Sequence, residues 1–322
     1  LQDPAGVPAL AEALQDADEY VRKSAVAALR RIGGPEAMAA LRTALTDRSE
    51  QVVLQAVNGL RDMRDKGAVE GLIRVLTRRE RSLVNAATEA LARIGPDAVK
   101  PLMTAFEDKA LRRRIGTQVW KILVEMGPRA VEPLLEVLGQ ENQFVRLTAI
   151  SVLGRVGDRR VVEPLVDLFL RDPSMQDAVV TTLSRLEERG VIEHPDPHHG
   201  DREIFLPRAV VDAFVGRPRE ELVEQLRTAL ENPSPKVRRF ALKALFTLFG
   251  EGALDQLITS LDDEDLDVKR LAVKILGRMR DKRVIEPLVQ LLLKDGEQIA
   301  DAVWNTLKVL TDLREYEALR AR

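Results

Sequence analysis

The chain has 322 residues, of which 45% are hydrophobic, 4% aromatic and 31% charged. Its 49 basic and 51 acidic side chains give a net charge of −2, a balance that argues against binding nucleic acid with the whole surface, although a local basic patch is compatible with it. The chain contains no cysteine, which excludes disulfides and cysteine-bound zinc and agrees with a cytoplasmic location, and no apolar run approaches the about 18 residues of a membrane span.

A leucine recurs at nearly constant spacing along the chain. It stands at Leu10, Leu41, Leu72, Leu102, Leu134, Leu165, Leu226, Leu257 and Leu288. All steps lie within one residue of 31 except the step from Leu165 to Leu226, which is 61. Because periods of 20–50 residues are typical of repeat proteins, we predict nine repeats and one deviant slot.

Each repeat is predicted to contain two helices. The first is short and carries proline in its first turn in several repeats, as at Pro133, where the missing N–H would be unpaired in any case. A polar turn precedes a longer amphipathic helix, in which Val21, Ala25 and Leu29 lie on one face. A small residue recurs at the position of Ala25, which indicates close contact between neighbouring second helices. Glycines predicted to form left-handed caps close many repeats: Gly33, Gly95, Gly127, Gly157 and Gly190.

Residues 130–134, 161–165 and 284–288 share the phrase Val/Ile-Glu-Pro-Leu, and a Val-Arg pair and spaced alanines follow in many repeats. This pattern resembles the short HEAT-like repeats of the phycobilin-lyase type over nearly the whole chain. The resemblance implies an all-α solenoid whose second helices line a concave binding face. We expect a single solenoid with repeats one to six in 1–190, the deviant slot in 191–218 and repeats seven to nine in 219–322.

A basic residue recurs twelve positions after the leucine in five repeats: Arg22, Arg114, Arg146, Arg238 and Lys269. We interpret it as a ladder in which each cation pairs with an acidic residue of the preceding turn, for example Arg22 with Asp16. The alternative is a row of guanidinium groups facing an acidic ligand.

Charge is distributed unevenly over the predicted turns. The third and fourth repeats hold a set that we name the basic edge: Arg78, Arg79, Arg81, Lys109, Arg112, Arg113 and Arg114. Stacking of the two repeats is expected to bring its two clusters side by side. The corresponding turn of the eighth repeat, residues 262–267, is acidic. The basic edge is either a solvated surface or a site for an acidic partner, with protein favoured over nucleic acid because no aromatic residues are interleaved for base stacking.

Trp120 and Trp304 lie in predicted second helices. We interpret both as filling the core. The alternative is that such a residue anchors a partner, because tryptophan is enriched at binding hot spots. Trp120 and Arg146 therefore join the basic edge as candidate partner-binding residues.

The deviant slot carries all three histidines of the chain, His194, His198 and His199. Prolines and glycine in 195–200 oppose a first helix there, whereas a second helix is expected from Pro207 onward. The histidines and nearby carboxylates could ligate a divalent metal, although a polar surface loop or a partner contact is favoured. We therefore assign no metal site and no cofactor.

Catalytic motifs are absent from the sequence: it has no Walker A loop and no dinucleotide fingerprint. The di-iron hydroxylases of the resembled family use His-Glu pairs, and no histidine here precedes glutamate. We therefore predict a non-catalytic scaffold or adaptor for protein partners. The alternatives are a chromophore-lyase-like accessory subunit and a nucleic-acid binder acting through the basic edge. Because the chain begins at Leu1 inside a repeat, we also expect further sequence before it in the natural protein.

Overall fold

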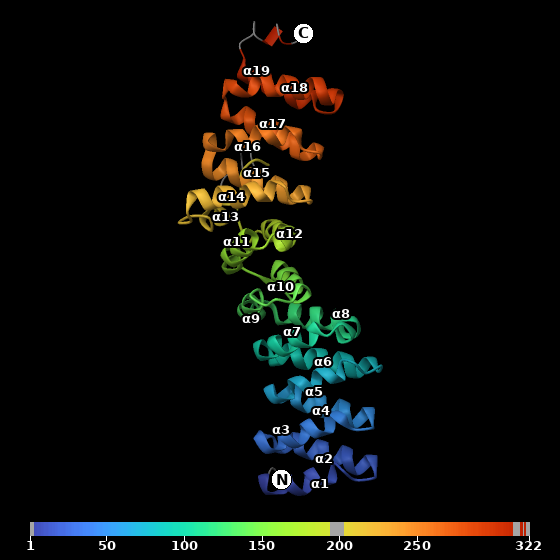
Figure 1. Cartoon of the computed structure of the whole chain (residues 1–322). Coiled ribbons are helices and arrows are strands. Elements are labelled where there is room, and N and C mark those ends of the chain that lie inside the picture. Colours follow the sequence, from blue (N-terminus) through green and yellow to red (C-terminus); the bar gives the residue numbers. More distant parts are fainter. Residues whose placement is uncertain (1–2, 194–202, 312–315, 318, 320–322) are drawn as a thin grey trace. The chain divides into compact units, whose positions relative to one another are not determined.

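The computed structural model describes residues 3–193, 203–311, 316–317 and 319, and no strand occurs within these ranges. The chain divides into two compact units, Leu1–Gly157 and Asp158–Arg322. Each unit is a stack of helix pairs, the architecture of an α-solenoid (Figure 1). No helix among the described residues is long and apolar enough to cross a membrane.

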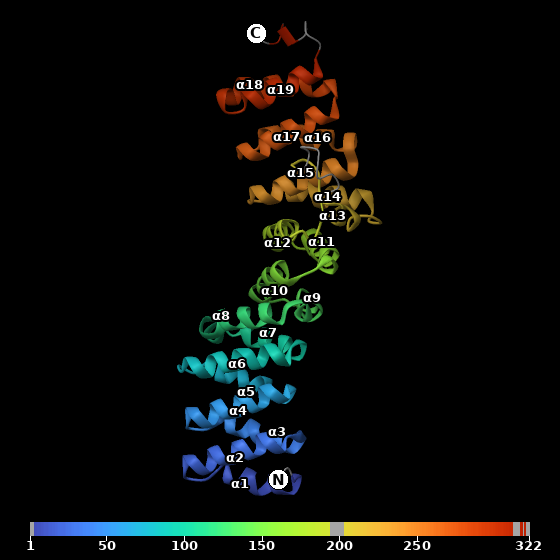
Figure 2. The same ribbon diagram turned by 180° about the vertical axis from the view of Figure 1, so that it is seen from behind.

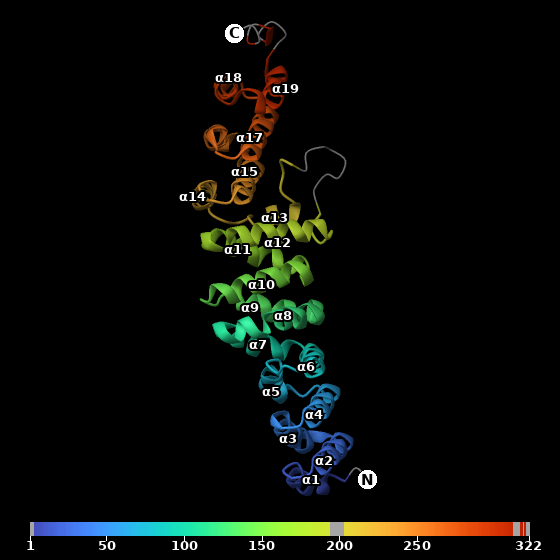
Figure 3. The same cartoon turned by 90° about the vertical axis from the view of Figure 1, so that its right-hand side faces the viewer.

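The first unit contains five helix pairs. Their helices are α1 (Val7–Ala13) and α2 (Glu19–Ile32), α3 (Gly34–Thr43) and α4 (Glu50–Met63), α5 (Val69–Val75) and α6 (Arg81–Ile94), α7 (Val99–Glu107) and α8 (Lys109–Met126), and α9 (Val131–Val137) and α10 (Gln143–Val156). The first helices form one layer and the second helices another, as the side view shows for α1 to α6 (Figure 3).

The second unit contains four further pairs and one short helix. The pairs are α11 (Val162–Arg171) and α12 (Gln176–Glu188), α14 (Arg219–Leu230) and α15 (Pro235–Phe249), α16 (Leu254–Thr259) and α17 (Leu266–Met279), and α18 (Ile285–Asp295) and α19 (Ala300–Leu310); α13 is Arg208–Asp212. The described residues therefore contain nine helix pairs, which agrees with an all-α solenoid of nine recognisable repeats.

The recurring apolar residues form the core. Eight of the nine marker leucines are fully buried, and Leu10 of the first repeat is half-buried. The alanines at the position of Ala25 are buried in every repeat that has one, with a relative exposure of at most 2%. A small side chain there lets the second helices of successive repeats pack directly, as α2 does with α4. The non-directional burial of these residues holds the layers together.

The ends of the second helices follow local chemistry. Side-chain oxygens accept a backbone N–H at the start of several, as Asp18 does for Tyr20 at 2.8 Å. Gly33 closes α2 with φ +69°, in the predicted left-handed region. Gly157 is an exception, because it closes α10 in an extended conformation with φ −64°. Arg64 takes the left-handed position after α4, which lacks a glycine.

Three of the five recurring cations, Arg22, Arg238 and Lys269, form a ladder of ion pairs, and their carboxylates come from the following repeat. Arg114 departs from it, because it donates to the Thr77 carbonyl of the preceding repeat.

Arg22, 4% exposed, donates from Nε to Oδ2 of Asp47 at 2.8 Å, and its Nη1 donates to the carbonyl oxygens of Asp16 and Ala17. The expected pairing of Arg22 with the Asp16 carboxylate is wrong. The preceding turn offers backbone acceptors close to the guanidinium, whereas stacking brings the carboxylate of the next repeat against it.

The same arrangement recurs in the second unit. Arg238 donates from Nε and Nη2 to the two carboxylate oxygens of Asp263, both at 2.8 Å, and from Nη1 to the carbonyls of Asn232 and Pro233. Lys269 forms an ion pair with Asp295 of the repeat after its own. These cations are structural, which disfavours the row of guanidinium groups facing a ligand.

The described part of the deviant slot, 191–193 and 203–218, contains one short helix, α13, and no helix pair. Helices α12 and α15 pack directly against each other, and α13 lies against α11 and α15 (Figure 2). Phe169 of α11 and Phe240 of α15 meet with ring centroids 4.9 Å apart. The second helix expected from Pro207 is limited to five residues, because Gly216 with φ +86° and Pro218 soon redirect the chain.

The ladder gives a stability prediction. Replacing Asp263 with alanine removes the carboxylate that binds the buried Arg238 guanidinium at two nitrogens and leaves it only the exposed Glu264, 3.3 Å from Nη2. We expect the free energy of local opening of α15–α17 to fall by about 3 kcal/mol. The matched control is Asp262→Ala, which removes an exposed pair with Lys294 and should cost about 0–1 kcal/mol. Hydrogen exchange read by mass spectrometry measures both locally, and equal effects would contradict a buried structural pair.

The ladder also has a pH dependence. Burial alone would raise the pKa of Asp47, but hydrogen bonds from the Arg22 side chain and the Ser49 N–H lower that pKa below its usual value. Ionised Asp47 therefore stabilises the fold above the unfolded-state pKa of about 3.9, and this contribution is lost as the pH falls through the lower folded-state value.

We expect the opening free energy of α2–α4 in the wild type to exceed that of Asp47→Asn by a constant amount between pH 7 and pH 5. The gap should shrink as the pH is lowered further, towards pH 2. Hydrogen exchange, corrected for the pH dependence of intrinsic rates, tests this. A gap of the same size at pH 2 would show that charge on Asp47 is not its source.

Candidate interaction sites

The basic edge lies at the N-terminal ends of two second helices. Arg78 and Arg79 are in the turn before α6, and Arg81 is the first residue of that helix. Residues 112–114 lie within α8 rather than in a turn, because Asp108 caps that helix early by accepting the N–H of Leu111 at 2.7 Å.

The two clusters of the basic edge lie side by side, as stacking predicts. Nη2 of Arg114 donates to the carbonyl oxygen of Thr77, in the turn before α6, at 2.6 Å. Arg78, Arg79, Arg81 and Arg114 line one open depression of about 770 Å³. A single acidic segment can therefore reach cations from both repeats.

The members of the basic edge differ in what they contact. Arg112 donates to the carbonyl of Phe106 at 2.9 Å, and its guanidinium carbon lies 4.1 Å from the centroid of the Phe144 ring, which is a cation–π contact. Arg79, Arg81 and Arg113 are exposed and form no hydrogen bond or ion pair with any residue that the structure describes. The edge thus presents charge that the fold does not neutralise.

The repeat alignment contains a signal for this site. Arg78 stands 31 residues after Asp47, the carboxylate of the ladder, and Val53 stands 31 residues after Arg22, the cation. In this layer a buried valine replaces the cation and an arginine replaces the acid. The basic character of the edge follows from this reversal, which comparison of the ladder positions alone could have found.

The other candidates have different surroundings. Trp120 is 41% exposed on α8, so its interpretation as a core residue is wrong. It lies two turns after Arg113 on the same side of the helix. Trp304 is half-buried and packs edge-on against Tyr316 at 5.8 Å. Arg146 is half-buried in α10.

The acidic turn of the eighth repeat is largely engaged within the fold. Asp263 belongs to the ladder, and Asp265 caps α17 by accepting the N–H groups of Asp267 and Val268. Asp262 pairs with Lys294 at 2.7 Å. Asp263 and Asp265 are thus structural, whereas the Asp262 and Glu264 side chains remain 74% and 83% exposed.

His194, His198 and His199 lie outside the described residues. Within the part of the chain that the structure does describe, no group of three or more histidine or carboxylate side chains is placed to hold a metal ion.

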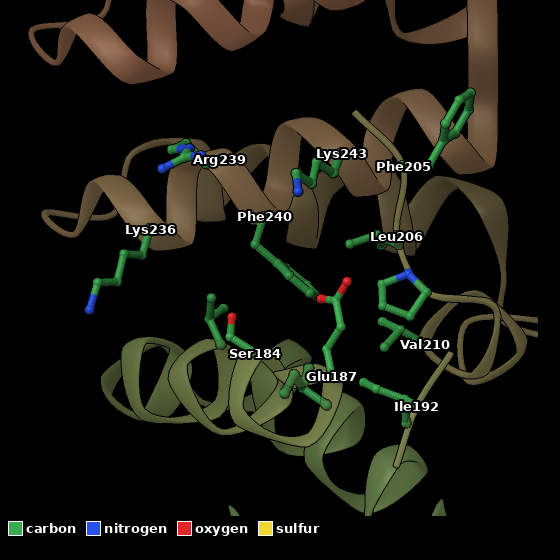
Figure 4. A pocket seen from close by; sticks show the side chains of 13 residues that line it. Ser184, Glu187, Ile192, Phe205, Leu206, Val210, Lys236, Arg239, Phe240 and Lys243 are labelled. Carbon is green, nitrogen blue, oxygen red and sulfur yellow. The ribbon is translucent and has the colours of Figure 1, made fainter. Parts of the chain in front are cut away.

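A pocket that no sequence motif predicts lies in the second unit, between α12 and α15 (Figure 4). The end of the deviant slot closes one side of it: the Leu206 N–H faces Oγ1 of Thr247 at 3.4 Å, and Glu203 pairs with Lys274 of α17 at 2.5 Å. The pocket has an apolar floor that includes Phe240 and Val210, a rim from α15 and a volume of about 170 Å³.

Comparison with known proteins supports the prediction of HEAT-like repeats. The family model for HEAT repeats matches residues 1–57, 107–184 and 220–308, without separating out the phycobilin-lyase type. No curated protein matches.

Two solved structures share similarity over most of their length. An engineered protein is 20% identical, with a TM-score of 0.41, over 94% of this chain and 88% of its own. Human deoxyhypusine hydroxylase in complex with glycerol is 19% identical, with a TM-score of 0.30, over 95% of this chain and 96% of its own.

The link between the two clusters is testable. Arg114→Ala removes the hydrogen bond to the Thr77 carbonyl, and we expect the turn at 76–80 to exchange its amide hydrogens about fivefold faster, the equivalent of about 1 kcal/mol. Lys109→Ala removes a nearby cation with no such bond and should leave that turn unchanged. Equal protection of the turn in wild type and Arg114→Ala would show that the bond does not couple the repeats.

Proposed function

We propose, from the fact that this chain belongs to the family of HEAT repeat proteins, that it is a non-catalytic scaffold whose basic edge binds an acidic protein partner. HEAT repeats commonly mediate protein–protein interactions, and the family by itself names neither the face nor the partner. The choice of face comes from the residues.

The observation that carries the proposal is a contrast between two sets of cations. Arg22 and Arg238 are buried and bound to carboxylates. Arg79, Arg81 and Arg113 are exposed and pair with no carboxylate among the described residues. The first set is needed for stacking, whereas the second set is available to a partner.

A protein partner would use this edge in two ways. Its carboxylates would be attracted to the unpaired guanidinium groups, which accelerates association and makes binding sensitive to salt. Trp120 adds a large, partly exposed aromatic surface on the same side of α8 as Arg113, and such residues carry much of the binding energy in protein interfaces.

The experiment compares two double variants. Arg79→Glu with Arg113→Glu reverses the charge of two exposed members of the basic edge without breaking any described side-chain hydrogen bond. Arg31→Glu with Arg155→Glu changes the net charge equally at exposed positions in the last turns of α2 and α10. Wild type and both variants are used for nuclease-treated affinity capture from host lysate, followed by mass spectrometry.

We expect one stoichiometric protein to be retained by wild type and the control and to be reduced at least tenfold on the edge variant. Equal retention on all three baits would remove the basic edge from the proposal. Retention of nucleic acid in place of protein would favour the nucleic-acid alternative, and a coloured tetrapyrrole bound to the bait would favour the chromophore-lyase alternative.

A further inference from the structure

The second unit contains a pocket whose chemistry is partly apolar and partly cationic. Lys236, Arg239 and Lys243 stand three and four residues apart on α15, so they share one face of the helix. Phe240 and Leu206 supply apolar surface beneath them (Figure 4). A ligand that fits both kinds of surface must combine an apolar group with a negative charge.

Arg239 is the group that most requires a ligand. Its Nε is buried and has no hydrogen-bond acceptor among the residues that the structure describes. Leaving a buried donor unpaired is costly, the more so when it is charged. A ligand carboxylate in the pocket would pair with the part of the Arg239 guanidinium that lines it, since Nε itself is covered by protein.

The charged residues around Arg239 are Lys243 of the same helix and Glu187 of α12. Burial lowers the pKa of Lys243, Glu187 acts against that effect, and Arg239 lowers the pKa further. Figure 4 shows Glu187 reaching into the pocket from α12, opposite Lys243 on α15. Among the residues that line the pocket, Lys236, Arg239 and Lys243 are basic and Glu187 is acidic. The Glu187 carboxylate would repel a ligand that carries several phosphates.

The size of the pocket selects among anionic ligands. Cavities of ~150 Å³ accept a benzene ring, whereas small-molecule sites are usually about 300–1,000 Å³. A pocket of about 170 Å³ therefore fits one bulky side chain.

The surface continues beyond this pocket. Arg239 also lines an adjoining depression of about 510 Å³ over α17 and α19. Two ion pairs line it as well, Lys274 with Glu203 and Arg270 with Asp267. An extended chain leaving the pocket past Arg239 would meet these paired charges next.

We propose that the pocket between α12 and α15 anchors an acidic peptide: one bulky apolar side chain enters the pocket, and a carboxylate within a few residues of it binds Arg239. The rest of the peptide runs across α17. This site lies in the second unit and does not depend on the basic edge.

The test begins with a phage-displayed library of random twelve-residue peptides, selected on the full chain. The enriched peptides are synthesised with a fluorescein label, and their binding is measured by fluorescence anisotropy. Two variants probe the site. Arg239→Glu reverses its central charge, and Ser184→Trp places a large side chain at an exposed position on the pocket wall.

Arg227→Glu on α14 is the matched control, because Arg227 is exposed and lines neither depression. Thermal melting establishes that each variant is folded. We expect enriched peptides to carry aspartate or glutamate within three residues of a bulky apolar residue. Their Kd should rise at least tenfold with Arg239→Glu and with Ser184→Trp and change less than twofold with Arg227→Glu.

Several outcomes would overturn the proposal. They are the absence of enrichment, enriched peptides without acidic residues, and acidic peptides that bind Arg239→Glu as tightly as wild type. Acidic peptides that are lost only from the Arg79→Glu, Arg113→Glu variant would assign the binding to the basic edge, and so separate the two proposals. Displacement of the peptide by equimolar octanoate would identify a small carboxylate ligand instead.

Discussion

Arg22 with Asp47, and Arg238 with Asp263, form buried ion pairs across the boundary between successive repeats. Burial of the recurring leucines and alanines stabilises the contact between neighbouring repeats, but this hydrophobic interaction is not directional. Each guanidinium requires a specific geometry, because it donates to two carbonyl oxygens of its own turn and to both oxygens of a carboxylate in the next repeat. A buried pair adds little net stability over apolar residues, but breaking it is costly, so it fixes how one repeat sits on the next.

The stack changes its chemistry where this pair is missing. At the ladder position of α12 stands Asp177, which accepts a hydrogen bond from Ser234 of the turn before α15, while Gln176 accepts one from Asn232 at 2.9 Å. These bonds join α11–α12 directly to α14–α15. Helix α13 therefore packs against α11 and α15, and residues 205–207 before it close the pocket over α15. The deviant slot thus accounts for both the irregular repeat and one wall of the candidate peptide site.

The periodic part of this fold could be predicted from sequence, because residues such as Leu41 and Ala56 are buried at apolar positions that recur from repeat to repeat. The partner of Arg22 was misassigned because Asp16 is near it along the chain, whereas Asp47 is brought near only by stacking. The pocket could not be predicted for a similar reason. Its lining residues Ser184, Leu206 and Arg239 come from three segments, and they lie close together only because the end of the deviant slot packs against α12 and α15. Adjacency between equivalent positions is predictable, and adjacency created by an irregularity is not.

The ladder also separates structural charge from available charge. Asp262, Asp263 and Asp265 look like an acidic surface in the sequence, yet all three are bound within the fold. Arg78 occupies the same repeat position as Asp263, but the ladder cation it would face is replaced by buried Val53. Arg78 forms no ion pair there and donates instead to the backbone carbonyl of Asp47 at 3.4 Å. In this chain, departures from the ladder are therefore better guides to binding residues than Arg22, Arg238 and Lys269, because the next repeat already holds these three cations.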